Sequence, residues 1–217
     1  MKKLDLPAGE MHVWWSPSAE APAGAVAVLT PEERERRARF HFESDREAYL
    51  AAHAMLRLLL ATYGSSASTQ RFAETERGKP FVDGGPEINL SHTRGLVACA
   101  FSRSFAVGVD VEPVERTNDW RRLMSRVLCA AEIADILGRS APRQQHRFYE
   151  FWTAKEAWSK ALGLGLHADF RAMNALDPST EIFLSRLEVV PEFCLAAAAD
   201  AHPSKVVVER FDWKSMA

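Results

Sequence analysis

The chain has 217 residues and a formal net charge of −2, from 27 basic and 29 acidic side chains. This length suffices for one large or two small globular domains, and the near-neutral charge argues against a strongly basic nucleic-acid binder. No apolar run is long enough to span a membrane, and Asp5, Pro7 and Glu10 interrupt any N-terminal signal sequence. We therefore expect a cytoplasmic protein, in which Cys99, Cys129 and Cys194 are small buried thiols and not a disulfide framework or a zinc site.

Two helices are predicted in the first third of the chain. Thr30, Pro31 and Glu33 form a capping-box pattern at the start of a short charged helix. Ser44 and Glu47 repeat the pattern before a longer helix that runs to about Tyr63, with leucines at helical spacing on its core-facing side.

Strands follow a loop rich in glycine and proline. The runs EINLSH, LVACAF and FAVGVDVE read as strands, and Ser102–Ser104 between the last two suits a hairpin. Helices are expected at 120–128, 130–137 and 143–162, and strands at 186–190, 193–198 and 206–211. This order predicts an α+β fold in two similar halves with antiparallel hairpins.

The strand VGVDVE carries two carboxylates. Because side chains alternate across a strand, Gly108, Asp110 and Glu112 share one face, and the intervening valines share the other. Two neighbouring carboxylates repel each other unless a cation lies between them, and hard oxygen ligands suit Mg²⁺. The alternative is a solvated strand face that ends in a turn.

The segment FWTAKEAWSKALGLGL places a second set of groups on one helix face. Trp152, Glu156 and Lys160 recur at intervals of four residues, whereas Phe148, Phe151, Trp158 and Leu162 are predicted to face the core. The alternative for Glu156 and Lys160 is a surface ion pair worth about 0.3 kcal/mol.

A third set of polar side chains lies in GKP and NLSHT. These motifs contribute Lys79, Asn89, Ser91 and His92. The lysine and the histidine could hold phosphate oxygens, with the lysine acting as a point charge. A structural histidine remains an alternative for His92, and a solvated helix face remains one for the basic cluster that contains Arg36.

The order GKP, NLSHT, GVDVE and WTAKEAWSKALGLGL resembles the 4′-phosphopantetheinyl transferase superfamily, in particular its larger monomeric type that activates peptide and polyketide synthetases. The motifs span about residues 78–166, and Thr93 departs from the serine that many relatives carry after the histidine. The resemblance implies transfer of the phosphopantetheine arm of coenzyme A to a serine of an apo acyl or peptidyl carrier protein, with release of adenosine 3′,5′-bisphosphate.

The resemblance also assigns roles to residues. It implies that Asp110, Glu112 and Glu156 bind Mg²⁺, with Mn²⁺ as a possible substitute, and that Glu156 is the general base, directly or through a water. Lys160 would neutralise charge on the pyrophosphate, and Trp152 would shape the pocket. The coenzyme A ligands would be Arg36, Lys79, Ser91, His92 and Lys160.

The fold that the resemblance implies has two pseudo-symmetric α/β halves, each a small antiparallel sheet packed with helices, with the active site at their junction. We assign residues 1–105 to the first half and 106–217 to the second, and expect a monomer. Two other functions fit the same residues: a Mg²⁺-dependent nuclease or phosphohydrolase, and a catalytically silent module that binds coenzyme A.

Overall fold

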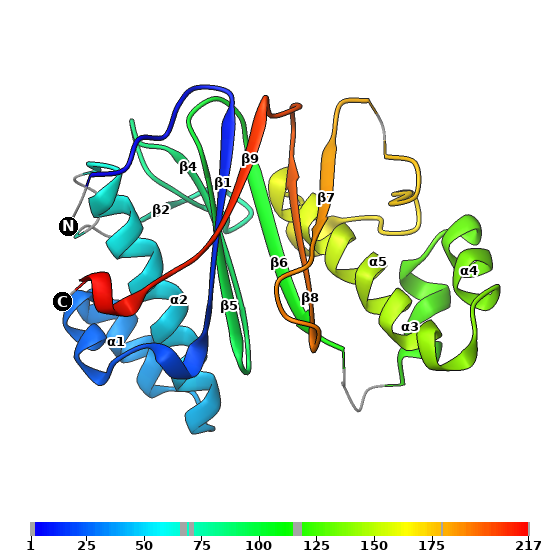
Figure 1. Cartoon of the computed structure of the whole chain (residues 1–217), viewed down its shortest axis with the longest axis horizontal. Coiled ribbons are helices and arrows are strands. Elements are labelled where there is room, and N and C mark those ends of the chain that lie inside the picture. The colour runs from blue at the N-terminus through cyan, green and yellow to red at the C-terminus, as the bar shows by residue number, and fades with distance from the viewer. Residues whose placement is uncertain (1–2, 66–68, 70–71, 115–118, 179, 217) are drawn as a thin grey trace.

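The computed structural model describes residues 3–65, 69, 72–114, 119–178 and 180–216. Two sheets pack against each other in the middle of the molecule, and helices cover the outer side of each (Figure 1). The layers run from helix to sheet to sheet to helix. This arrangement agrees with the predicted α+β class and with two similar halves.

The first sheet contains four strands in the order β4-β5-β1-β9. Their bounds are Glu87–Thr93, Leu96–Ser102, Glu10–Pro17 and Lys205–Arg210. β4 and β5 form an antiparallel hairpin, and β1 pairs antiparallel with β5. β9 pairs with β1 in parallel, so this sheet is mixed and not the purely antiparallel sheet that was predicted. The C-terminal strand therefore belongs in space to the first half of the chain.

The second sheet contains three antiparallel strands in the order β6-β8-β7. Their bounds are Val107–Pro113, Phe193–Ala199 and Phe183–Leu187. A separate two-stranded ribbon pairs β2 (Ala73–Glu74) with β3 (Pro80–Phe81). β6 is therefore an edge strand of its own sheet, and it lies beside β4 of the other sheet.

Five α-helices lie outside the sheets in the described part of the chain. Their bounds are α1 Pro31–Ala38, α2 Glu43–Thr62, α3 Trp120–Val127, α4 Ala130–Leu137 and α5 Ala141–Ala161. α1 begins with the predicted capping box, in which Thr30 accepts from the amide of Glu33 and the Glu33 carboxylate accepts from the amide of Thr30. Short 3₁₀ turns occupy Ser18–Glu20, Ala23–Val28, Gly165–His167 and Trp213–Met216.

Three apolar clusters hold these layers together. One joins α2 to the first sheet, and one joins α5 to the second sheet. The third lies between the sheets, where Val107, Val109 and Val111 of β6 meet Met11 and Val13 of β1. The valine face of β6 therefore lies in the core, as the alternation of side chains along the strand predicts, and the opposite face packs against α5.

Three local predictions were wrong. β5 and β6 do not form a hairpin, because Ser102–Ser104 carries the chain from one sheet to the other. α2 begins at Glu43 with Phe42 as its N-cap and has no side-chain cap, so Ser44 and Glu47 are not a capping box. Leu162 is 42% exposed, because α5 ends at Ala161 and the chain turns away from the core.

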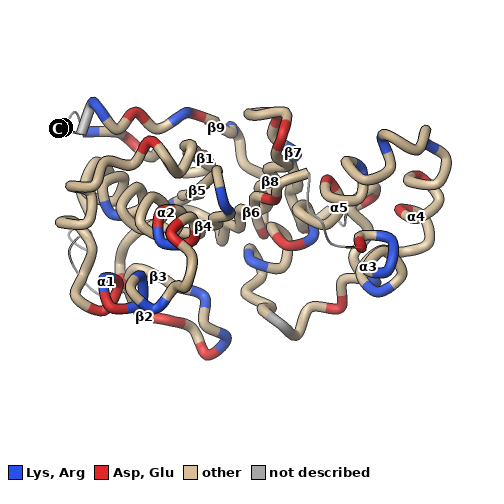
Figure 2. The backbone as a smooth tube through the Cα atoms, turned by 90° about the horizontal axis from the view of Figure 1, so that it is seen from below, with Lys and Arg blue, Asp and Glu red and all other residues tan. Residues whose placement is uncertain are grey.

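Charged residues of both signs are interspersed along the chain (Figure 2). Among the described helices, none has both the length and the apolar content that a membrane crossing needs.

Candidate functional site

Asp110 and Glu112 lie on the face of β6 that meets α5. The close approach depends on Gly108, because a Cβ there would lie 2.0 Å from the carbonyl oxygen of Ala157. Asp110 is only 6% exposed, which excludes a solvated strand face. A buried carboxylate needs hydrogen-bond or ionic partners, and α5 packs against this face of β6.

The predicted stripe of α5 contacts these carboxylates. Trp152 donates from Nε1 to Oε1 of Glu112 at 3.2 Å, and Lys160 donates from Nζ to Oδ1 of Asp110 at 2.7 Å. Lys160 also donates to the carbonyl oxygen of Val109 at 3.1 Å. Lys160 is thus ion-paired with Asp110, and no ion pair between Lys160 and Glu156 is found in the described part of the chain.

Glu156 completes a group of three carboxylates. Burial, together with the charges of Asp110 and Glu112, raises the pKa of Glu156 to about 7 against the lowering effect of Lys160. A carboxyl group with a pKa near neutrality can take up a proton from a substrate hydroxyl and release it again at physiological pH. The site therefore contains a group suited to general base catalysis.

The donor set fits a hard divalent cation. It consists of carboxylate oxygens, and Oδ2 of Asp110 is buried without a hydrogen-bond partner among the described groups. A cation there would satisfy that oxygen and would lower the pKa of Glu156. As the side chains stand, no cluster of three or more His, Cys, Asp or Glu within the described residues has the arrangement of a metal site.

Ser91 of β4 reaches across to the same carboxylate. Its hydroxyl donates to Oδ1 of Asp110 at 2.8 Å and accepts from Nζ of Lys160 at 3.0 Å. The side chain is 7% exposed. The junction of the two sheets is thus the place where residues of both halves meet, as predicted for the active site.

A cavity of about 360 Å³ lies on the first-half side of this junction. Arg36 of α1 and His92 of β4 line it, together with the aromatic side chains of Phe40, Tyr49 and Phe72. Burial lowers the pKa of His92 to about 4, and the positive charges of Lys160 and Arg36 add to that effect. His92 is therefore neutral at pH 7 in the free protein and can donate a hydrogen bond to an anion.

Lys79 lies near the end of α5. Its Nζ donates to the carbonyl oxygen of Ala161 at 3.0 Å and is 4.0 Å from Oε2 of Glu87. Burial lowers the pKa of Lys79. Lys79 lines a different hollow from His92, next to Gly163, so the structure places it near the end of α5 and not beside Arg36.

Known proteins match nearly the whole chain. Residues 106–205 match the family model of the 4′-phosphopantetheinyl transferase superfamily, and residues 13–103 match that of the 4′-phosphopantetheinyl transferase N-terminal region. The 4′-phosphopantetheinyl transferase HetI of Nostoc sp. is 33% identical over 91% of this chain and 90% of its own length. The chain belongs to the 4′-phosphopantetheinyl transferase superfamily.

Two other family members match over most of this chain. The 4′-phosphopantetheinyl transferase Sfp of Bacillus subtilis is 28% identical over 82% of this chain and 84% of its own length. A phosphopantetheinyl transferase of Thraustochytrium sp. is 32% identical over 90% of this chain and 75% of its own length. The predicted family is confirmed, and the two family models meet between residues 103 and 106.

Sequence analysis missed two residues of α2, Arg57 and His53, which hold α1 and its Arg36 in place. Arg57 is fully buried and makes two hydrogen bonds to the Glu33 carboxylate, and His53 bonds to the same group at 3.0 Å. Burial would raise the pKa of Glu33, but these bonds outweigh it and lower the pKa to about 2. Glu33 lies one helical turn before Arg36, so this ion pair fixes α1 where it lines the cavity. Glu33 and Arg57 are 24 positions apart in the sequence, so no local sequence motif predicts this contact.

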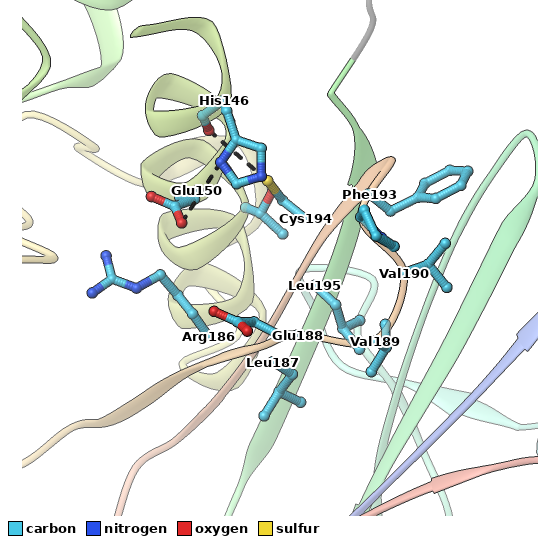
Figure 3. A pocket seen from close by; sticks show the side chains of 12 residues that line it. His146, Glu150, Arg186, Leu187, Glu188, Val189, Val190, Phe193, Cys194 and Leu195 are labelled. Carbon is cyan, nitrogen blue, oxygen red and sulfur yellow. Dashed lines mark hydrogen bonds and ion pairs between the residues drawn. The ribbon is translucent and has the colours of Figure 1, made fainter. Parts of the chain in front are cut away.

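A second cavity, of about 530 Å³, lies between α5 and the β7–β8 hairpin (Figure 3). Figure 3 shows Glu150 of α5 on the side of Arg186, whereas His146 lies next to Cys194 of β8. None of the predicted site residues lines it, and Glu150 is already paired with Arg147 at 2.8 Å. We therefore place the functional site at the β4–β6 junction.

The raised pKa of Glu156 predicts how metal-free stability changes with pH. Its pKa is about 7 in the folded chain, against 4.5 for an unperturbed glutamate, so the folded state holds the proton more tightly. This contribution to stability is present at low pH and is lost as the pH rises from about 4.5 through about 7. The Glu156→Gln variant should lack this loss of stability with rising pH. His92, whose pKa is lowered, changes stability in the opposite direction below about pH 6.5.

Urea unfolding in EDTA at pH 5, 6, 7 and 8 measures this difference. The free energy of unfolding of the wild type minus that of Glu156→Gln should fall from pH 5 to pH 7 and level off by pH 8. A difference that stays constant would show that Glu156 titrates as it does in the unfolded chain.

Proposed function

We propose that this protein transfers the 4′-phosphopantetheine arm of coenzyme A to a serine of an apo carrier protein and releases adenosine 3′,5′-bisphosphate. One observation carries the proposal within the family. The Trp152–Glu156–Lys160 stripe of α5 lies against Asp110 and Glu112 of β6, beside a cavity lined by Arg36 and His92. A base, a cation and an acidic metal-binding face thereby meet next to a pocket for an anion.

Asp110, Glu112 and Glu156 would hold a divalent cation, Mg²⁺ or Mn²⁺. When bound, the cation would neutralise their charges and those of the coenzyme A pyrophosphate. Glu156 removes the proton from the carrier serine while the serine oxygen attacks the phosphorus that bears the pantetheine. The bond from that phosphorus to the bridging oxygen breaks, and the electron pair leaves with adenosine 3′,5′-bisphosphate. Lys160 stabilises the negative charge that develops on the pyrophosphate.

The other end of coenzyme A would lie on the first half of the chain. Arg36 and His92 would hold the 3′-phosphate, with the backbone at Ser91 beside them and Lys79 near the end of α5. Trp152 would form one wall of the pocket. The remaining elements of the proposal are a monomer, located in the cytoplasm, with acyl or peptidyl carrier proteins as partners. Its halves divide near residue 105, except that β9 returns to the first sheet.

Intact mass spectrometry tests the function directly. An apo carrier protein is incubated with this protein, coenzyme A and Mg²⁺, beside a reaction that contains EDTA. A gain of one phosphopantetheine on the carrier, absent with EDTA, is the expected result. Hydrolysis of phosphodiesters without any gain would favour a nuclease or phosphohydrolase, and coenzyme A binding without any gain would favour a silent module.

His92→Ala tests the position of the 3′-phosphate. The neutral His92 can donate one hydrogen bond to that group, so the variant should raise the KM for coenzyme A by about tenfold. It should change the KM for 3′-dephospho-coenzyme A by less than twofold. Equal changes with both substrates would place His92 away from the 3′-phosphate.

A further inference from the structure

β4 and β6 belong to different sheets, yet polar side chains connect them. Oδ1 of Asn89 accepts from the amide of Val109 at 2.9 Å, and Oγ of Ser91 accepts from the amide of Val111 at 3.4 Å. Asn89 is 4% exposed and Ser91 is 7% exposed. Alternate residues of β4 thus bind alternate amides of β6, and these two amides flank Asp110.

Among the described groups, Ser91 makes two contacts that Asn89 lacks, and in one of them its hydroxyl accepts from Nζ of Lys160 at 3.0 Å. Its hydroxyl donates to Oδ1 of Asp110, and Lys160 donates to the same oxygen at 2.7 Å. Two donors on one carboxylate oxygen fix the rotation of the carboxylate. Oδ2 is left buried and without a hydrogen-bond partner among the described groups.

We propose that Ser91 is a positioning residue for the divalent cation, because its hydrogen bond to Oδ1 orients Asp110 so that Oδ2 faces the cation. The inference rests on the proposed function, which supplies the cation. It differs from a role in contacting coenzyme A, because the hydroxyl acts on the carboxylate and not on the substrate. Hydrogen bonds from outside the ligand shell that orient a metal ligand are worth about 10- to 100-fold in metal affinity.

A purely structural role is the competing explanation, and Asn89 provides the matched control. Asn89→Ala removes the same kind of bond between β4 and β6 without touching Asp110. Ser91→Ala removes that bond, the hydrogen bond to Oδ1 of Asp110 and the hydrogen bond that Lys160 donates to the hydroxyl. Loss of a bond between the strands alone would lower the thermal stability of both variants and leave their metal affinity similar.

The experiment titrates each protein with Mn²⁺ alone and follows free Mn²⁺ by electron paramagnetic resonance, beside a thermal unfolding curve. Ser91→Ala should weaken Mn²⁺ binding by about tenfold or more, whereas Asn89→Ala should change it by less than twofold. Ser91→Cys, which keeps nearly the same volume with a weaker donor, replaces Ser91→Ala if the alanine variant does not fold and should also weaken binding.

Three results would overturn the proposal. They are unchanged Mn²⁺ affinity in the Ser91 variants, an equal loss in the Ser91 and Asn89 variants, and no Mn²⁺ binding by the wild type. The proposed function fails separately, by the absence of phosphopantetheine transfer from a wild-type protein that does bind Mn²⁺.

Discussion

Glu156→Gln is expected to reduce phosphopantetheine transfer by about 1,000-fold or more while the protein stays folded. The amide has the size of the carboxyl group, but it cannot accept the serine proton and brings no charge to a cation. General base catalysis alone contributes about 100- to 10,000-fold, and loss of a metal ligand adds to that effect. The single-turnover rate on an apo carrier, followed by intact mass, measures the loss without interference from product release.

The matched control is Glu181→Gln, which makes the same chemical change at an exposed turn before β7. It should transfer at the wild-type rate. The Glu156 variant should keep the circular dichroism spectrum of the wild type and should still bind coenzyme A. A Glu156→Gln protein that transfers within tenfold of the wild-type rate would remove Glu156 from the chemical step.

Gly108→Ala is expected to destabilise the protein by about 3 kcal/mol and to abolish transfer as well. The added Cβ would lie 2.0 Å from the carbonyl oxygen of Ala157 and 2.4 Å from the amide nitrogen of Ala161. Both are backbone atoms of α5, so no side-chain rotation relieves the overlap, and the helix must move away from β6. Lys160 and Glu156 would move with the helix, away from Asp110.

Gly24→Ala serves as the control for the same substitution. A Cβ at Gly24 would meet no atom within 4 Å, so its free energy of unfolding should stay within about 0.5 kcal/mol of the wild type. Urea unfolding of both variants, with the transfer assay alongside, separates the two effects. A Gly108→Ala protein with wild-type stability would mean that α5 does not pack against β6 this closely.

The part of the site that could be predicted from sequence depends on short-range periodicity. Alternation along β6 placed Asp110 and Glu112 on one face, and a helical repeat placed Trp152, Glu156 and Lys160 on another. Each pattern lies within one element, where backbone geometry alone fixes which side chains share a face. The match of these motifs to a family then supplied the pairing of the two faces, which periodicity could not.

The features that could not be predicted from the sequence depend on contacts between residues that are distant along the chain. Arg57 and His53 lie among apolar residues in the sequence of α2, and their partner Glu33 has the sequence pattern of an ordinary capping residue. The hydrogen bond from Ser91 to Asp110 joins two sheets that no local signal relates. The expected hairpin at Ser102–Ser104 was wrong for the same reason, because a tight polar link between two apolar runs does not determine which strands pair.

The parallel pairing of β9 with β1 makes the second sheet an insertion within the first half of the molecule. The chain leaves the first sheet after β5, builds the second sheet with its helices, and returns to complete the first with β9, Phe211 and Trp213. A fragment cut after residue 105 would therefore lack an edge strand and two buried aromatic side chains. Separating the halves as independent folding units requires a second cut before residue 205 and a new covalent link from β5 to β9.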